Sequence, residues 1–123
     1  MKEIRSLILW ILLFPYFIFF LIFAVVVSYI FSPQKYTPWL QTLLRFMFKI
    51  MFVKVDVDGL ENIIPNKTYL YMANHVSLFD IPLLGGFIPG YARGVEADRQ
   101  HAWPLYGWAM SRLGITEKIF SVL

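Results

Sequence analysis

The sequence predicts an α/β fold, in which an N-terminal hydrophobic helix or helix pair precedes the first part of a mixed-sheet α/β domain. Residues 1–51 join a long apolar run to an amphipathic segment, a combination typical of membrane-associated helices. From residue 52 onward, short stretches with strand-like patterns alternate with turn residues and helical segments. We therefore divide the chain into a hydrophobic membrane anchor with an interfacial helix (1–51) and an α/β part (52–123).

The composition favours a protein that works at a membrane surface. Hydrophobic residues make up 59% of the 123 residues and aromatic residues 19%, well above ordinary globular usage. The formal net charge is +3 and the Lys and Arg residues are scattered, which indicates an anionic membrane surface rather than nucleic acid as the partner. The chain contains no Cys, and Asp56 and Asp58 have no third ligand nearby, so no metal site is expected.

The apolar run covers residues 7–31 and is interrupted only by Pro15 and Ser28. At about 1.5 Å per residue it reaches roughly 37 Å, enough to cross a hydrocarbon core of about 30 Å. Pro15 predicts a kink, so a single span and a re-entrant pair of short helices both remain open. Two Lys or Arg residues precede the run and three follow soon after it. If the run spans the membrane, this slight excess places the rest of the chain on the cytoplasmic side of the inner membrane.

A second helix is predicted over residues 37–51, with Thr37 as N-cap and Pro38 in the first turn. Its polar residues recur every four positions and form one narrow stripe of Gln41, Arg45 and Lys49. This pattern indicates a helix in the membrane interface with its stripe toward the lipid headgroups. The alternative is a helix that packs on the protein and keeps one edge in water.

The α/β part is predicted from two strand patterns. Residues 53–58 alternate Val with charged residues, which predicts a half-exposed strand, and the apolar residues 69–73 predict a buried one. The remaining predictions are a helix that starts at Ile81 and ends before Gly85-Gly86, a short strand over 91–95 and a helix over 103–113.

The candidate site lies between the buried strand and the helix at Ile81. His75 and Asp80 are five residues apart, so they can meet only if the chain turns between them. In such a turn the Asp80 carboxylate accepts a hydrogen bond from one imidazole nitrogen of His75 and leaves the other nitrogen as a proton acceptor. This arrangement predicts general-base activation of a substrate hydroxyl. The alternative is structural: Asp80 caps the helix, and His75 is a polar residue at a strand end.

Asn74, His75, Ser77 and Asp80 together resemble the Asn-His-x-Ser-x-x-Asp signature of the glycerolipid acyltransferases, the family that includes 1-acylglycerol-3-phosphate acyltransferase. The resemblance implies that His75 and Asp80 are catalytic, that Asn74 and Ser77 support the motif, and that the sheet belongs to an acyltransferase domain. The segment from Trp103 to Trp108 resembles a second block of that family. The Arg that follows this block in the family has no counterpart here.

A third block of the family, Pro-Glu-Gly-Thr-Arg, binds the acceptor phosphate and is absent from this sequence. The candidates left for that role are Arg93, Arg99 and Arg112. The chain is therefore expected to be the N-terminal part of an enzyme, through truncation, a split gene or an incomplete sequence. A separately encoded C-terminal half is a candidate partner, and the chain alone is expected to show no measurable acyl transfer.

The resemblance implies transfer of a fatty acyl group to a hydroxyl of a lysophosphatidate-like glycerolipid in phospholipid synthesis. Acyl-CoA or acyl carrier protein would be the co-substrate, membrane lipid the partner, and no cofactor or metal is implied. A second class stays open, namely a catalytically inactive, membrane-anchored remnant or interaction protein.

Overall fold

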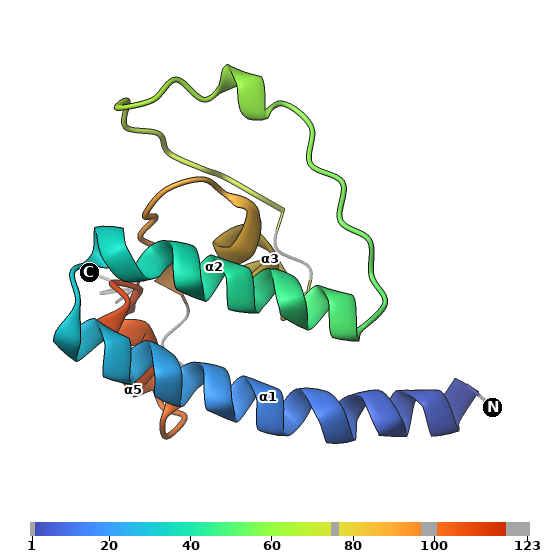
Figure 1. The fold of residues 1–123 in the computed structure, drawn as a ribbon. Coiled ribbons are helices and arrows are strands. Elements are labelled where there is room, and N and C mark those ends of the chain that lie inside the picture. The colour runs from blue at the N-terminus through green and yellow to red at the C-terminus, as the bar shows by residue number, and fades with distance from the viewer. Residues whose placement is uncertain (1, 75–76, 97–100, 118–123) are drawn as a thin grey trace, which may run out of the picture.

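The fold is a helix hairpin with two shorter helices packed against it (Figure 1). The computed structural model describes residues 2–74, 77–96 and 101–117. Within these residues the elements, in chain order, are α1 (Lys2–Ile30), α2 (Pro33–Ile50), the 3-10 helix η1 (Leu60–Asn62), α3 (Asp80–Phe87), β1 (Val95–Glu96), α5 (Tyr106–Arg112) and β2 (Thr116–Glu117). α1 and α2 run antiparallel, α3 packs against α2, and α5 packs against α1.

α1 is a single apolar helix that continues through Pro15. Its 29 residues extend over about 43 Å. Among the described residues it is the one helix that is long and apolar enough to cross a membrane, judged by length and composition. The apolar N-terminal helix is thus confirmed, whereas the alternative of two short helices within residues 7–31 is wrong. α1 pairs instead with α2.

α2 begins before its predicted start. Ser32 has an extended backbone at the N-cap, and Pro33 is the first helical residue, where its fixed φ suits the helix and its missing N–H is not needed. Thr37 lies inside the helix, and its hydroxyl donates a hydrogen bond to the Pro33 carbonyl at 2.6 Å. The signal at Ser32-Pro33 therefore set the start of the helix, and the similar signal at Thr37-Pro38 did not.

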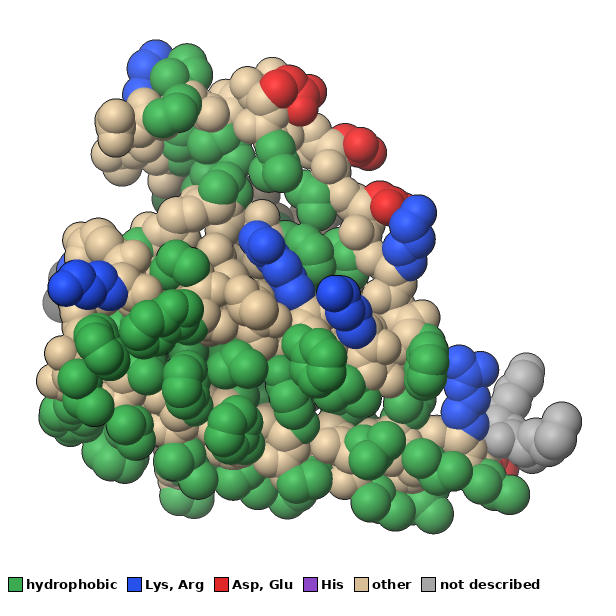
Figure 2. Space-filling model, viewed as in Figure 1, with side chains coloured by type: hydrophobic (Ala, Val, Ile, Leu, Met, Phe, Trp, Pro, Cys, Tyr) green, Lys and Arg blue, Asp and Glu red, His purple; other side chains and the backbone are tan. Residues whose placement is uncertain are grey.

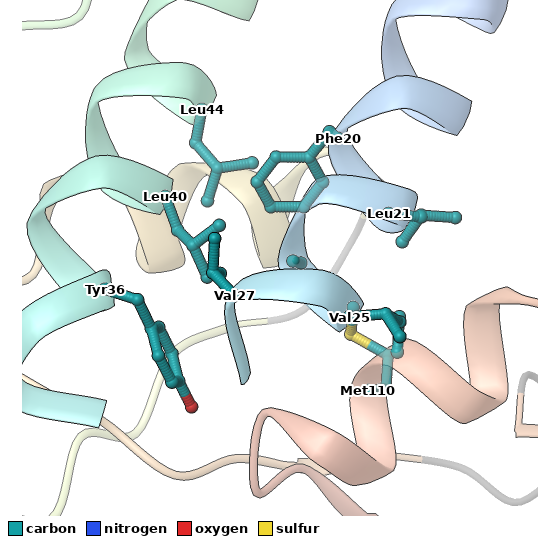
Figure 3. Packing of buried hydrophobic residues seen from close by; sticks show 10 residues of the cluster. Phe20, Leu21, Val25, Val27, Tyr36, Leu40, Leu44 and Met110 are labelled. Atoms are coloured by element: carbon teal, nitrogen blue, oxygen red, sulfur yellow. The ribbon is translucent and has the colours of Figure 1, made fainter. Parts of the chain in front are cut away.

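The main core lies where α1, α2 and α5 meet (Figure 3). Its buried residues are Phe20, Leu21, Ala24, Val25, Val27, Tyr36, Leu40, Leu44, Ala109 and Met110. Figure 3 shows Leu40 and Leu44 of α2 directed toward α1, with Met110 of α5 beside Val25 of α1. A second cluster joins α1, α2 and α3, and its buried residues are Leu13, Met47 and Phe48. α2 is therefore held between α1 on one side and α3 on the other.

The predicted mixed-sheet α/β fold is wrong for the residues that the structure describes, which are mainly helical. The predicted strands at 53–58 and 69–73 have no regular secondary structure. The second is not buried either, since Leu70 is 87% exposed and Met72 88% exposed. The extended pairing in the described ranges is a two-residue parallel contact between β1 and β2, too short to form a layer. Alternation marks a possible buried face, but a strand also needs a hydrogen-bonded neighbour, and these segments have none among the described residues.

Two helices at the C-terminal side of the chain were predicted with different bounds. α3 runs through Gly85 and Gly86 to Phe87, so the predicted break at Gly85-Gly86 is wrong. The helix predicted over 103–113 is confirmed as α5, which starts three residues later and is followed by Gly114 at φ 82°. Just before α5, His101 has both ring nitrogens buried.

Candidate active site

The motif lies at the N-terminal end of α3. Asn74 is exposed and precedes α3 without regular secondary structure. His75 lies outside the described residues, so the predicted contact between His75 and Asp80 stays a prediction. The structure describes the second half of the motif, from Ser77 to Asp80.

Ser77 to Asp80 form a tight turn that is closed by three hydrogen bonds. The Asp80 N–H donates to the Ser77 carbonyl at 3.1 Å. In return, the Ser77 N–H donates to Oδ2 of Asp80 at 2.9 Å. The Phe79 N–H donates to the hydroxyl oxygen of Ser77 at 3.2 Å. The Ser and Asp of the motif thus brace each other. The supporting role that the resemblance implied for Ser77 in acyl transfer stays a prediction.

Asp80 is the first residue of α3, and Phe79 occupies the N-cap position without a side-chain cap. A carboxylate in the first turn is favoured by the partial positive charge at a helix N-terminus. Because Oδ2 is held by a backbone N–H, the carboxylate has a defined orientation relative to the turn. The structure therefore shows Asp80 stabilising the turn that starts α3, and such a bond is compatible with a second role in orienting a base.

The polar stripe of α2 anchors the other end of α3. Nε of Arg45 donates to the Gly86 carbonyl at 2.7 Å. Nε2 of Gln41 donates to the Ile88 carbonyl at 2.6 Å and lies 3.4 Å from the Gly90 carbonyl. These two residues bind backbone carbonyls at the end of α3, as expected for a helix packed on the protein. The orientation of the stripe toward lipid headgroups stays a prediction. Sequence reasoning found the stripe but missed its partner, because the i, i+4 spacing shows that residues share a face and not what that face contacts.

Apolar packing reinforces the contact between α2 and α3. Phe48 and Phe87 form an edge-to-face pair with ring centroids 6.0 Å apart. A Cβ atom at Gly85 would lie 3.1 Å from Cδ1 of Leu44, and one at Gly86 would lie 3.2 Å from Cβ of Leu44. The two glycines therefore allow a close approach of the helices that larger residues would prevent.

The three arginines proposed for substrate binding have different surroundings. Arg112 reaches the end of α1, where Nη2 donates to the Ser28 carbonyl at 3.2 Å and the guanidinium lies 4.0 Å from the ring centroid of Tyr29. Arg93 is exposed, with its guanidinium 5.9 Å from the Tyr91 ring centroid. Arg99 lies outside the described residues. Arg112 thus links α5 to α1, while the proposed phosphate-binding role of all three stays a prediction.

Burial raises the pKa of the Tyr36 hydroxyl, the neighbouring Tyr91 adds to the increase, and the positive charge of Arg112 opposes it. Within the described ranges, no group of three or more His, Asp or Glu side chains could hold a metal ion.

Comparison with known proteins identifies the class to which this motif belongs. The sequence profile of the family described as Acyltransferase matches residues 54–117, just over half of the chain. The chain belongs to the acyltransferase family, as the motif resemblance predicted. The lyso-ornithine lipid O-acyltransferase of Pseudomonas aeruginosa is 42% identical over 81 residues, which are 66% of this chain and 28% of that relative. No solved structure matches the chain significantly.

Proposed function

We propose that the chain carries the catalytic motif of a membrane-bound enzyme that transfers a fatty acyl group from a thioester to a hydroxyl of a lyso-lipid. The observation that carries this proposal is the braced turn from Ser77 to Asp80 at the start of α3, on a helix that is bonded to an apolar helix hairpin. Family membership and the name of the relative support a lipid acceptor. Lysophosphatidate and lyso-ornithine lipid are the two acceptors to compare first.

The proposed reaction needs no covalent acyl-enzyme. His75 takes the proton of the acceptor hydroxyl while Asp80 orients the imidazole and stabilises its charged form. The hydroxyl oxygen attacks the thioester carbonyl of acyl-CoA or acyl carrier protein and forms a tetrahedral intermediate. Collapse of this intermediate breaks the C–S bond, and the proton held by His75 passes to the departing thiolate. The products are the acylated lipid and the free thiol.

We place the helix hairpin in one leaflet of the membrane, with the outward face of α1 among the acyl chains. This face exposes large apolar side chains along much of the helix, including Ile4, Leu7, Trp10, Phe14, Phe19 and Ile22. Figure 2 shows hydrophobic side chains as a broad band over α1 and the adjoining part of α2, whereas most of the Lys and Arg side chains in this view lie outside that band. A contiguous apolar surface of this extent is typical of a membrane contact.

A single span is less compatible with the hairpin. α2 lies alongside α1, so a spanning α1 would carry Arg45 and Lys49 of α2 toward membrane depth. A charged side chain there costs at least about 3 kcal/mol. An orientation parallel to the surface keeps these residues and α3 near the headgroups. Anionic lipids of the cytoplasmic leaflet would attract the basic residues, which supports a cytoplasmic site.

The proposed function is tested in a chimera with the P. aeruginosa relative. In this chimera, residues 1–123 replace the segment of the relative that they match, and the remainder of the relative is kept. Purified membranes containing this chimera receive labelled acyl-CoA or acyl carrier protein and each of the two lyso-lipids. The proposal predicts transfer to an acceptor with a free hydroxyl and none to its deoxy analogue. A well-folded chimera that transfers to neither acceptor would favour the inactive remnant or interaction protein.

A further inference from the structure

We infer that Gln41 and Arg45 are positioning residues for acyl transfer, which act by holding α3 so that Asp80 stays in its working orientation. The inference rests on the proposed function, in which Asp80 serves the catalytic base. Gln41 and Arg45 touch neither the motif turn nor the motif residues in the bonds described above. Their effect passes along α3, from the Gly86 and Ile88 carbonyls at its C-terminal end to its first residue, Asp80.

α3 depends on its neighbours for its position. It has eight residues, and helices shorter than about 12–15 residues are marginal in isolation. The last carbonyls of a helix have no hydrogen-bond donors within the helix. Two side chains of α2 donate hydrogen bonds at this end of α3. Arg45 binds the Gly86 carbonyl, and Gln41 binds the Ile88 carbonyl just beyond the helix. The positive charge of Arg45 also suits the negative end of the helix dipole.

Arg45 is held in place by a second contact. Its guanidinium lies 5.5 Å from the ring centroid of Phe87, the last residue of α3. One side chain of α2 thus contacts both the backbone and the side-chain surface at the end of α3. The two contacts limit rotation of α3 about its C-terminal end more than a single hydrogen bond would.

The length of α3 turns a small rotation at one end into a large displacement at the other. Eight residues extend over about 12 Å, so a rotation of about 10° at the Gly86 end moves Asp80 by about 2 Å. Catalytic groups must be held within about 0.5 Å of their productive geometry. Loss of the α2 contacts is therefore expected to reduce the rate of acyl transfer without any change in the catalytic residues themselves.

The sequence provides a matched control in the same stripe. Lys49 lies one turn beyond Arg45 on α2 and is exposed. Its ammonium group has no hydrogen bond or ion pair within the part of the chain that the structure describes. Replacement of Lys49 by Met changes the charge of α2 as Arg45→Met does, but it removes no contact with α3.

The first experiment measures the position of α3 without any activity. Amide hydrogen exchange of α3 is followed in the 123-residue chain in lipid nanodiscs, as wild type and as Gln41→Met, Arg45→Met and Lys49→Met. We expect exchange in α3 to be about tenfold faster in the Gln41 and Arg45 variants and unchanged in the Lys49 variant. Unchanged exchange in the first two variants would overturn the inference, as would equal acceleration in all three.

The second experiment measures catalysis in the chimera. We expect Gln41→Met and Arg45→Met to lower kcat tenfold or more with little change in KM for the lyso-lipid, and Lys49→Met to leave both unchanged. An unchanged kcat in the Gln41 and Arg45 variants would overturn the inference even if α3 exchanges faster. A chimera without activity would refute the proposed function and the positioning role with it, while the exchange data alone decide whether α3 is held by α2.

Rescue by a cross-link separates positioning from a general loss of stability. The chain has no Cys, and a Cβ at Gly86 would lie 3.2 Å from Cβ of Leu44, close to the 3.5–4.5 Å of a disulfide. Leu44→Cys with Gly86→Cys should therefore cross-link α2 to α3 on oxidation once the two helices move apart by a few tenths of an ångström. We expect the oxidised pair to restore at least half of the kcat lost in Arg45→Met, and reduction to abolish the rescue. A cross-linked Arg45→Met chimera that stays slow would contradict a positioning role.

Discussion

Substitution of Ala at Gly85 and at Gly86 should have opposite effects, although the residues are neighbours in α3. Each substitution removes a glycine from a helix, which favours the helix by about 1 kcal/mol. Each also adds a methyl group at the contact with Leu44. The difference lies in the part of Leu44 that the new methyl group meets.

The methyl group at Gly85 would lie 3.1 Å from Cδ1 of Leu44, the end of a side chain that can change its rotamer. The methyl group at Gly86 would lie 3.2 Å from Cβ of Leu44 and 3.6 Å from the Arg45 backbone nitrogen, and neither atom can move without α2. Added atoms in a packed site cost about 1–3 kcal/mol. Gly85→Ala should therefore stabilise α3 by up to about 1 kcal/mol, and Gly86→Ala should destabilise it by about 1 kcal/mol.

Hydrogen exchange of the α3 amides in nanodiscs measures both effects, since about 1.4 kcal/mol corresponds to a tenfold change. Exchange should be up to about fivefold slower in Gly85→Ala and about fivefold faster in Gly86→Ala. A further variant, Gly85→Ala with Leu44→Val, removes the atom that the Gly85 methyl group meets and serves as a control for that contact. Equal shifts in the same direction for Gly85→Ala and Gly86→Ala would refute the close packing of α3 on α2.

Three further predictions concern the motif, the link between α5 and α1, and the membrane. Asp80→Asn keeps an oxygen that can accept the hydrogen bond of the Ser77 N–H, so the free energy of unfolding should fall by less than about 1 kcal/mol. Because the charge that orients the base is lost, acyl transfer by the chimera should fall by about 10²-fold or more. Asp58→Asn serves as the control and should change neither quantity. Arg112→Met removes the contacts with Ser28 and Tyr29 and should lower the free energy of unfolding by about 1–2 kcal/mol. A urea titration followed by circular dichroism measures this change. An unchanged midpoint of the titration would contradict the link between α5 and α1. The chain should remain in the membrane fraction after carbonate extraction, and recovery in the soluble fraction would refute the membrane role of α1.

The helices could be predicted from the sequence because their signals are local. A continuous apolar run gave α1, and four-residue spacing of polar groups gave the stripe of α2. The sheet could not be predicted in this way. The residues at 53–58 have the right alternation, but strand formation depends on a neighbour that the pattern does not specify. Leu70 and Met72 look like core residues in the sequence and are almost fully exposed in the structure.

The motif itself could be found from the sequence, because its residues have fixed spacing within one turn. Its support could not be found, because Gln41 and Arg45 are about 40 or more residues away from the carbonyls that they bind. Gly85-Gly86 was the second missed signal. Two glycines in a row resemble a break, yet here they form the surface on which Leu44 packs. For the stripe of α2 and for Gly85-Gly86 of α3, the sequence did not show that these two helices pack against each other.

The rate of acyl transfer by the chimera with and without His75 tests the central claim most directly. The imidazole is proposed to take the proton of the lyso-lipid hydroxyl, a contribution of about 10²–10⁴ in rate. We predict that His75→Ala lowers kcat by at least about 10²-fold, while hydrogen exchange in α3 and binding of the lyso-lipid stay unchanged. A His75→Ala chimera that retains more than about half of the parental rate would contradict general-base catalysis by this motif.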